Sequence, residues 1–377
     1  MKLSCSQSEL SRGLSIVGRA VATRTTLPIT GNVLLVAEES RLKLVATNLE
    51  MAISYWIGAT VAQEGTITVP ARLLTEFVNS LPNENIDMEL SERTKTLSLK
   101  CARFEARISG VDARDFPPIP DINEGIQTTL QVDTLRKGIS HVAFAAATEE
   151  SRPVLTGVDA RFEGKILTLA AADGFRLAVY RIDLAEEVKQ TAEVIIPART
   201  LTELNRMIGD DDETVDITIN PNKSQALFRL TKTELVSQLV QGTFPQYQQL
   251  VPQSHSTSVT VEVAEFLRAT RTASIFARDG SGIVRLVAGT DGEAAPGKLT
   301  ISARSEEIGE DSGEIDAVVE GEETKIAFNG RYLIDVLSVI SEPKVVLETT
   351  NSSSPGVIKP VGSENYVHVV MPMFVQW

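Results

Sequence analysis

The sequence predicts an α+β fold made of three copies of one domain, each with two helices packed on antiparallel sheets. Three observations lead to this prediction. The chain has 377 residues, which is more than one hydrophobic core usually holds and enough for two to four domains. Short stretches recur in register at intervals of 125 to 132 residues. Within each interval, helical spacing of apolar residues gives way to short alternating segments.

The repeats mark a strand and the start of a helix in every copy. A strand led by glycine reads GNVLLV, GVDARF and GIVRLV, from Gly31, Gly157 and Gly282. Further along, VPARLL, IPARTL and FNGRYL open a helix-like stretch. An interval of this length is one ordinary domain rather than a unit of a solenoid. Joins rich in turn residues lie near Ile119–Gln127 and Val251–Ser258. We therefore expect domains at residues 1–125, 126–252 and 253–377.

Two helices are expected in each copy. The first is amphipathic, as where Leu10, Leu14 and Val17 recur at a spacing of three or four residues. The second follows a proline or a glycine, and we expect Pro70 and Pro197 at the first helical position, where the missing N–H needs no partner. The six expected helices span residues 8–24, 70–80, 132–147, 197–208, 263–278 and 330–340. Gly, Asn and Asp separate about seven or eight short strands per copy.

Composition excludes several classes of protein. No apolar run approaches the roughly 20 residues that a membrane-spanning helix needs. The first residues, MKLSCSQSEL, lack the basic start and apolar stretch of a signal peptide, so a cytoplasmic protein is expected. Cys5 and Cys101 are far apart, which favours a reducing compartment. Two cysteines and three scattered histidines do not make a zinc site, and we expect no metal.

Motifs for catalysis are weak. The stretch GEAAPGK, residues 292–298, has the spacing of a phosphate-binding loop, but Leu299 stands where Ser or Thr would bind magnesium. The residues that follow read as a strand rather than a helix. No G-x-S-x-G motif is present, and the acidic run Asp210–Glu213 is typical of a solvated loop. The sequence therefore predicts a protein that is not an enzyme and has no cofactor.

The net charge of −14 is unlike that of most nucleic-acid-binding proteins, but the charge is segregated. The six expected helices hold twelve Lys or Arg and six Asp or Glu, a net of +6, and the rest of the chain carries −20. One face can therefore be electropositive, and the local field governs binding. Arg72, Arg199 and Arg331 each lie in a first helical turn, where the helix dipole disfavours a cation. Either an ion pair repeated by duplication or a DNA-facing surface explains them.

Six stretches, in order along the whole chain, resemble the bacterial β sliding clamp family, the processivity subunit of DNA polymerase III. They are TLPITGNVLL, TNLEMAI, AADGFRLAV, LVQGTFPQY, FNGRYLIDVL and HVVMPM. The resemblance implies three similar domains per subunit and two subunits joined head to tail in a six-domain ring, with helices lining the hole. It also implies that the ring encircles duplex DNA without reading its sequence. The ring would tether the replicative polymerase and other partners, including repair proteins, through short peptide motifs, after loading by a separate ATP-driven loader.

The resemblance also assigns site residues. The partner-peptide pocket falls on Leu155, Ala172, Gly174, Phe175, Arg176, Leu177, Pro245, Val369, Val370, Met371, Pro372 and Met373. Phe175 stands where the family often has a polar ring, Gln249 where a basic residue is common, and the chain ends in the bulky stretch Phe374–Trp377. The resemblance places Arg24 and Arg152 on DNA, beside Arg72 and Arg199 from the charge pattern. It places Ile108, Ile275 and Phe276 at the dimer interface, and we expect them to be apolar residues that are exposed in the single chain and buried by the partner subunit.

Two other interpretations stay open. The chain could be a monomeric interaction scaffold of the same fold that does not encircle DNA, which the mass in solution would distinguish. It could also be a hydrolase, which would need a nucleophile arrangement that we do not find in the sequence.

Overall fold

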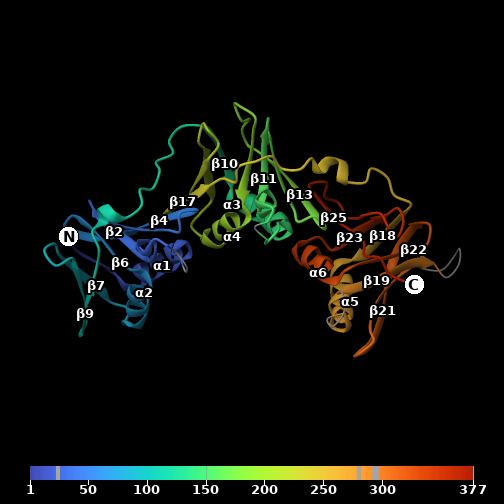
Figure 1. Ribbon diagram of the computed structural model, residues 1–377, viewed down its shortest axis with the longest axis horizontal. Helices are drawn as coiled ribbons and strands as arrows, with labels where there is room; N and C mark the ends of the chain where they lie inside the picture. Colours follow the sequence, from blue (N-terminus) through green and yellow to red (C-terminus); the bar gives the residue numbers. More distant parts are fainter. Residues whose placement is uncertain (23–25, 150, 278–281, 291–296, 377) are drawn as a thin grey trace. The chain divides into compact units, whose positions relative to one another are not determined.

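The computed structural model describes residues 1–22, 26–149, 151–277, 282–290 and 297–376. The chain forms two compact units (Figure 1). The first unit contains Met1–Asp133, Val188–Gln190 and Thr200–Leu239. The second contains Thr134–Glu187, Thr191–Arg199 and Val240–Trp377. Each unit is described by itself.

The first unit contains an antiparallel sheet of five strands in the order β5-β1-β7-β8-β9. Its strands are β1 (Lys2–Ser6), β5 (Thr60–Gln63), β7 (Asn85–Ser91), β8 (Thr96–Cys101) and β9 (Phe104–Ser109). One face is apolar, because alternate residues such as Leu3, Ile86 and Leu97 are buried while their neighbours face solvent. Strand β9 lies at the edge of this sheet, so one side of its backbone has no partner strand among the described residues.

A second sheet of the first unit has eight strands in the order β10-β15-β16-β17-β4-β3-β2-β6. Its first half consists of β10 (Ile126–Gln131), β15 (Thr214–Ile219), β16 (Gln225–Arg229) and β17 (Thr233–Gln238). Its second half consists of β4 (Met51–Gly58), β3 (Arg41–Thr47), β2 (Asn32–Glu38) and β6 (Gly65–Pro70). The halves join where Leu235 of β17 lies opposite Ile53 of β4. Ladder pairing therefore links strands that the repeat pattern assigns to different domains.

The second unit contains a sheet of twelve strands in the order β14-β11-β12-β13-β25-β24-β23-β18-β21-β20-β19-β22. The strands before the C-terminal copy are β11 (Gly157–Glu163), β12 (Ile166–Ala172), β13 (Arg176–Asp183) and β14 (Ala192–Pro197). The others are β18 (Thr257–Glu262), β19 (Ile283–Thr290), β20 (Gly297–Ser305), β21 (Gly309–Gly321), β22 (Thr324–Asn329), β23 (Lys344–Thr349), β24 (Gly356–Pro360) and β25 (Tyr366–Val370). Strands β13 and β25 join the two sets, with Leu177 opposite Val369.

All six expected helices are present, within a few residues of the expected bounds. They are α1 (Gln7–Val17), α2 (Ala71–Ser80), α3 (Val132–Val142), α4 (Ala198–Met207), α5 (Val263–Phe276) and α6 (Gly330–Val339). Two expected helices end early, because short 3-10 turns follow α1 at Gly18–Ala20 and α3 at Ala143–Ala145. The expected positions of Pro70 and Pro197 were each wrong by one residue: Pro70 ends β6 and caps α2, and Pro197 ends β14 directly before α4. Lys298, the last residue of the stretch GEAAPGK, lies in strand β20, and residues 292–296 of that stretch are outside the described residues.

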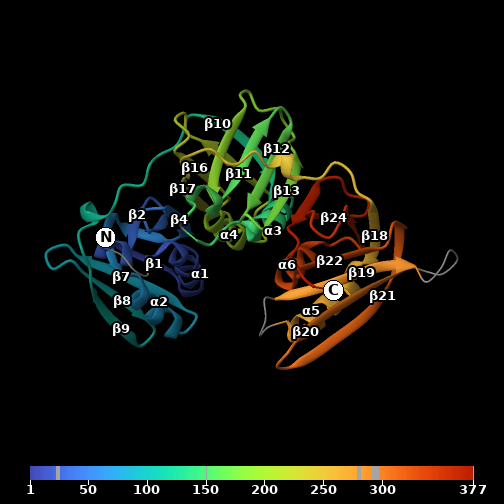
Figure 2. The ribbon, with the colours of Figure 1, turned by 45° about the vertical axis from the view of Figure 1, so that its right-hand side comes forward.

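Helices pack on one face of the sheets in each unit. In the first unit α1 contacts α2, β3 and β4, and in the second α5 contacts α6, β20 and β21. Figure 2 shows α5 and α6 against the strands of the C-terminal copy. Leu10, Leu14 and Ile53 are fully buried in the first unit, as are Phe266 and Phe328 in the second. Each such side chain contributes about 1.5–3 kcal/mol of hydrophobic stabilisation.

Irregular segments cover both places where strands of different copies pair. In the first unit Ile122 packs with Ala52 of β4 and Leu227 of β16. In the second unit Phe244 and Tyr247 pack on strands beside the β13–β25 junction. A buried connection has to be apolar, which explains these residues in otherwise polar joins. The second of these covers is next to the candidate site.

Candidate functional site

The candidate site in the second unit is built on an apolar cluster, here called the pocket cluster. It consists of the buried residues Leu155, Ala170, Leu177, Ile195, Phe244, Tyr247, Val357 and Val369. Leu177 and Val369 lie opposite each other on paired strands, so their side chains share one face of the sheet. Ala172, at the end of β12, packs against the cluster. Leu155 comes from the 3-10 turn Pro153–Thr156. Four of the predicted pocket residues thus gather here.

A tight turn between β12 and β13 shapes one side of the site. The Asp173 carboxylate accepts hydrogen bonds from the backbone N–H groups of Phe175 and Arg176, at 2.9 and 3.0 Å. Gly174 has φ +94°, a conformation that favours glycine. A Cβ there would also lie 2.9 Å from the guanidinium of Arg152. Glycine at this position therefore lets the turn expose Phe175.

Arg176 is buried on the opposite face of the sheet from the pocket cluster. Its guanidinium lies 3.0 Å from Asp173 and 2.6 Å from Asp335 of α6. It also donates a hydrogen bond to the Phe144 carbonyl at 2.7 Å, and it lies over the ring of Tyr332 at 4.5 Å. With only 9% of its side chain exposed, Arg176 connects β13 to α6 rather than lining the pocket.

The exposed part of the site is an apolar ledge formed by Phe175 and Met371. The backbone N–H of Met371 donates to the Phe175 carbonyl at 2.8 Å, which holds the two residues side by side. Their exposed fractions are 58% and 44%. Beyond them the Met373 N–H donates to the Ala327 carbonyl, and Phe374 is 86% exposed. Large apolar side chains left in water beside a buried apolar cluster are typical of a binding site.

The remaining predicted pocket residues differ in their placement. Pro245 is exposed between Phe244 and Tyr247, on the segment that covers the cluster. Pro372 is half-buried. Val370 is fully buried and lies opposite Arg176, so its side chain faces away from the pocket cluster. Gln249 is exposed near the end of the covering segment.

Sequence reasoning missed Ile195, Phe244, Tyr247 and Val357. The apolar pair Phe244 and Tyr247, three residues apart in the polar stretch QGTFPQYQQ, was the available signal for a covering turn. Ile195 and Val357 could be assigned to the cluster only from the strand register that the structure shows.

The arginines predicted to contact DNA lie in different surroundings. Arg24 is outside the described residues. Arg72 has a 91% exposed side chain and pairs with Glu76 of its own helix at 2.8 Å, and Arg199 is exposed in the first turn of α4. Arg152 instead donates to the Asp173 carbonyl at 3.0 Å, which places it beside the pocket turn. The helical ion pair of Arg72 agrees with the structural interpretation of that arginine, although an exposed pair of this kind leaves the residue available to a ligand.

The predicted interface residues separate into two kinds. Ile275 near the end of α5 is 51% exposed, and Phe276 is half-buried. Ile108 is only 3% exposed, because β9 pairs with β8 and directs Ile108 to the same inner face as Leu97. The expectation that Ile108 is an exposed apolar residue was therefore wrong. Phe104 on the same strand is 54% exposed.

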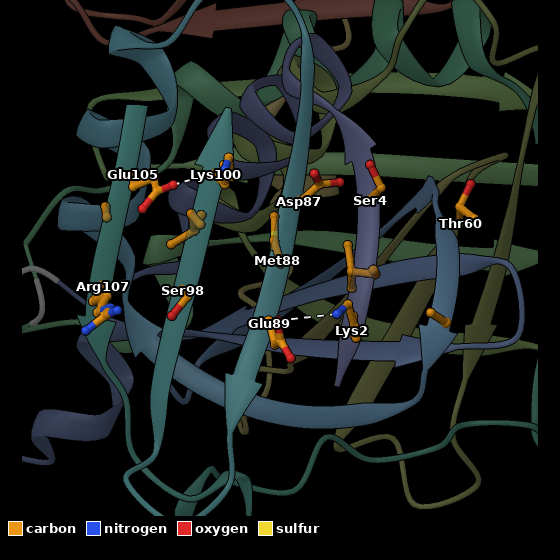
Figure 3. A pocket seen from close by; sticks show the side chains of 14 residues that line it. Lys2, Ser4, Thr60, Asp87, Met88, Glu89, Ser98, Lys100, Glu105 and Arg107 are labelled. Atoms are coloured by element: carbon orange, nitrogen blue, oxygen red, sulfur yellow. Dashed lines mark ion pairs between the residues drawn. The ribbon is translucent and has the colours of Figure 1, made fainter. Parts of the chain in front are cut away.

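A separate hollow of about 740 Å³ lies on the outer face of the five-stranded sheet in the first unit (Figure 3). Its charged side chains pair with one another: Lys2 with Glu89 at 3.5 Å, and Lys100 with Glu105 at 3.1 Å. All four are more than half exposed. The hollow is therefore the solvated face of a curved sheet, without a buried reactive group.

Across the described residues, no three His, Cys, Asp or Glu side chains are placed to hold a metal ion. In the same part of the chain, none of the helices is long and apolar enough to cross a membrane. Burial raises the pKa of the Cys5 thiol to about 12, so this cysteine is a poor nucleophile.

Comparison with known proteins identifies one protein family over almost the whole chain. Family models match residues 1–120 as the N-terminal domain, 129–246 as the central domain and 248–374 as the C-terminal domain of the DNA polymerase III beta subunit. A beta sliding clamp of Synechocystis is 34% identical over 99% of both chains, and that of Staphylococcus aureus is 31% identical over 94% of both. The DNA polymerase sliding clamp of Bacillus subtilis superposes with a TM-score of 0.94, 30% identity and full coverage of both chains. The chain belongs to the DNA polymerase III beta subunit family, the beta sliding clamps.

Proposed function

We propose that this protein is a DNA sliding clamp, a homodimeric ring that encircles duplex DNA and tethers a replicative polymerase during synthesis. The observation that carries the proposal is the match to the three clamp domains in their family order, over residues 1–120, 129–246 and 248–374. The protein acts by topology, so it needs no catalytic group. It works in the cytoplasm, where the bacterial chromosome is replicated.

Two surfaces of the chain support the dimer. The β8–β9 region of the N-terminal copy is basic at Lys95, Lys100, Arg103 and Arg107, and β9 is an edge strand. The β20–β21 hairpin of the C-terminal copy is acidic at Glu306, Glu307, Glu310, Asp311 and Glu314. Among the described strands, the segment 309–317 of β21 pairs only with β20. Opposite charges and two open strand edges favour head-to-tail pairing between N-terminal and C-terminal copies.

Apolar residues support the same interface. Ile275, half exposed on α5, and Leu73, half exposed on α2, are large side chains without an apolar cover in the single chain. Phe104 at the start of β9 is exposed to a similar extent. Burial of such side chains by a second protomer would stabilise the ring. The two interfaces of a closed dimer would each use the same pair of surfaces.

The pocket cluster and its ledge would bind short peptides of partner proteins. A leucine and a phenylalanine of such a peptide would reach the cleft beside Leu155, Leu177 and Val369, while Phe175 and Met371 would cover them. Methionine adapts to several shapes, which suits a site that serves many partners. Phe175 adds an apolar side chain to the rim of this pocket and Gln249 adds an uncharged one, so apolar anchors should matter more than acidic residues. The partners would include polymerase subunits, repair proteins and an ATP-driven clamp loader.

Contact with DNA would be weak and independent of sequence. Exposed helical arginines such as Arg72 and Arg199 would approach phosphates without reading base edges, which leaves the ring free to slide. We also propose that the domains of the ring divide at residues 125/126 and 252/253. The first position lies where strand β10 begins, and the second lies in the segment before strand β18.

The mass in solution tests this proposal against the alternative of a monomeric scaffold. Light scattering at micromolar concentration should give about twice 40.9 kDa. A monomer at every concentration tested would exclude the closed ring and favour the scaffold.

A further inference from the structure

A buried carboxylic acid, Asp159 on β11, lies beside the pocket cluster. Asp159 lies directly opposite Ala170 of β12 and Ile195 of β14 in the strand register. Residues opposite each other on antiparallel strands share a face, so Asp159 stands between two members of the apolar cluster. It is 3% exposed, and its Oδ1 atom has no hydrogen-bond partner among the residues that the structure describes. A carboxyl group in such surroundings is costly when it is ionised.

The segment Val240–Leu250, here called the covering segment, closes over this face. The Val240 N–H donates to the Ile195 carbonyl at 2.9 Å, beside Asp159 in the register. Phe244 and Tyr247 are buried in the cluster, with ring centroids 6.1 Å apart in an edge arrangement. Burial raises the pKa of Tyr247 to about 12, and the Asp159 charge adds to this effect, so the phenol lies within the field of the carboxyl group. The same segment carries Pro245 of the predicted pocket.

The charges around Asp159 do not compensate it. Burial, with a further contribution from the neighbouring Glu193 of β14, raises the pKa of Asp159 to about 7. Arg161 on the same strand acts in the opposite direction, but its guanidinium lies 3.0 Å from Glu163 and is shared with that carboxylate. On the covering segment the facing group is the Tyr247 phenol, which is also influenced by Arg181 of β13.

We propose that Asp159 acts as a proton-linked latch for the covering segment beside the peptide pocket. The neutral acid holds the covering segment closed, and the carboxylate loosens it. The consequence for peptide binding rests on the proposed clamp function, whereas the latch itself is a property of this chain.

The direction of the effect follows from proton binding. When the covering segment lifts, water reaches Asp159 and its pKa returns to the ordinary value near 4. The closed state therefore binds the proton more tightly than the open state. Closure is fully favoured below about pH 4, weakens as the pH rises to about 7, and changes little above that value. At neutral pH the covering segment is therefore held less firmly than it would be by its apolar contacts alone.

Hydrogen exchange of the full-length protein tests the latch directly. The variant Asp159→Asn keeps the size of the side chain and removes its charge. After correction for intrinsic exchange rates, the covering segment should be about tenfold better protected in the variant than in the natural sequence at pH 8. At pH 5 the two proteins should be more nearly equal. Comparing the proteins at each pH cancels the titration of other groups.

Two further variants make the test specific. Asp183→Asn removes an exposed carboxylate at the end of β13, and it should leave the exchange of the covering segment unchanged. Glu193→Gln removes the like charge near Asp159, so the loss of protection should end at a lower pH. Asp159→Asn should also raise Tm by about 2–4 °C at pH 8. Equal or lower protection in Asp159→Asn at pH 8 would overturn the latch.

Peptide binding provides a separate measurement. A short peptide with a leucine and a phenylalanine anchor should bind the natural protein more weakly at pH 7.5 than at pH 5.5. Asp159→Asn should remove this difference. If no such peptide binds at any pH, the proposed pocket fails, while the exchange result still decides the latch. If the peptide binds with the same pH dependence in both proteins, the latch does not control the pocket.

Discussion

The guanidinium of Arg176 lies 2.6 Å from the carboxylate of Asp335, which joins strand β13 to helix α6 within the second unit. The two residues are 159 positions apart in the sequence. The same guanidinium pairs with Asp173, whose carboxylate fixes the turn that presents Phe175. The shape of the peptide ledge therefore depends on a contact with the C-terminal copy.

Replacement of Arg176 by methionine should destabilise the second unit. Asp173 and Asp335 would lose a shared cation that is 9% exposed, at a cost of about 3 kcal/mol. Urea denaturation measures this change in the free energy of unfolding. Arg72→Met is the matched control, because the side chains of its ion pair with Glu76 are 91% and 63% exposed, so its loss should leave the free energy of unfolding nearly unchanged. Equal effects in the two variants would contradict the assigned role of Arg176.

Replacement of Ile275 by arginine should convert the dimer into monomers. The side chain is half exposed in the single chain, so the monomer itself should fold, but a charge at the apolar interface costs several kcal/mol. Sedimentation or light scattering would show the mass fall toward 40.9 kDa. Ile166→Arg, at a strand position that is 43% exposed, should stay dimeric. A dimeric Ile275→Arg protein would exclude this part of α5 from the interface.

Replacement of Met371 by aspartate should abolish peptide binding while the dimer stays intact. Met371 is 44% exposed on the ledge, so the change alters the surface without burying a charge in the core. Leu177→Asp is less informative, because Leu177 is 3% exposed and the buried charge would also unfold the unit. Calorimetry with a leucine–phenylalanine peptide checks this. Unchanged affinity in Met371→Asp would remove the ledge from the site.

The sequence was sufficient for the helices and for four of the residues that gather at the apolar pocket cluster, because both depend on local patterns. Leu10, Leu14 and Val17 follow the period of a helix, and Leu177 and Val369 lie in contiguous stretches that resemble the family. The cover of the pocket was missed, because Phe244 and Ile195 come together only through tertiary packing. Ile108 was misplaced for a related reason. Strand alternation gives two faces, and only the pairing with β8 decides which face is inner.

The stability of the second unit should fall in acid because of His368. Complete burial lowers the pKa of His368 to about 3, with a smaller contribution from Arg176. The unfolded chain takes up this proton below about pH 6.5 and the native chain does not, so stability is lost as the pH falls from about 6.5 toward 3. At pH 5 the loss is about 2 kcal/mol. Urea denaturation at pH 7.5 and pH 5 measures it.

His368→Gln should reduce that acid-dependent loss, even if it lowers stability at neutral pH through poorer packing. His255→Gln is the control, since the His255 side chain is 43% exposed rather than buried. If the free energy of unfolding of His368→Gln still falls by the same amount between pH 7.5 and pH 5, another group causes the acid-dependent loss. Stability rises with pH because of His368 and falls with pH because of Asp159. The two contributions can therefore be separated by comparing the His368 and Asp159 variants.

The last prediction separates a ring from a protein that is held on DNA by affinity. Free protein should bind linear duplex weakly, without sequence preference, and less as salt increases, because only phosphate attraction operates. After loading onto nicked circular DNA by a clamp loader with ATP, it should remain bound at salt that abolishes equilibrium binding. Gel filtration of the protein–DNA complex measures the retained fraction.

Cutting that circle once should release the protein quickly, although no contact between protein and DNA has changed. The chain carries −14 overall, so attraction alone cannot hold it at high salt, and a ring slides off a free end. Blocking both ends of the cut DNA with bulky proteins should restore retention, which separates sliding from damage to the complex. Equal retention on open and circular DNA would mean that affinity holds the protein, and the topological mechanism would have to be abandoned.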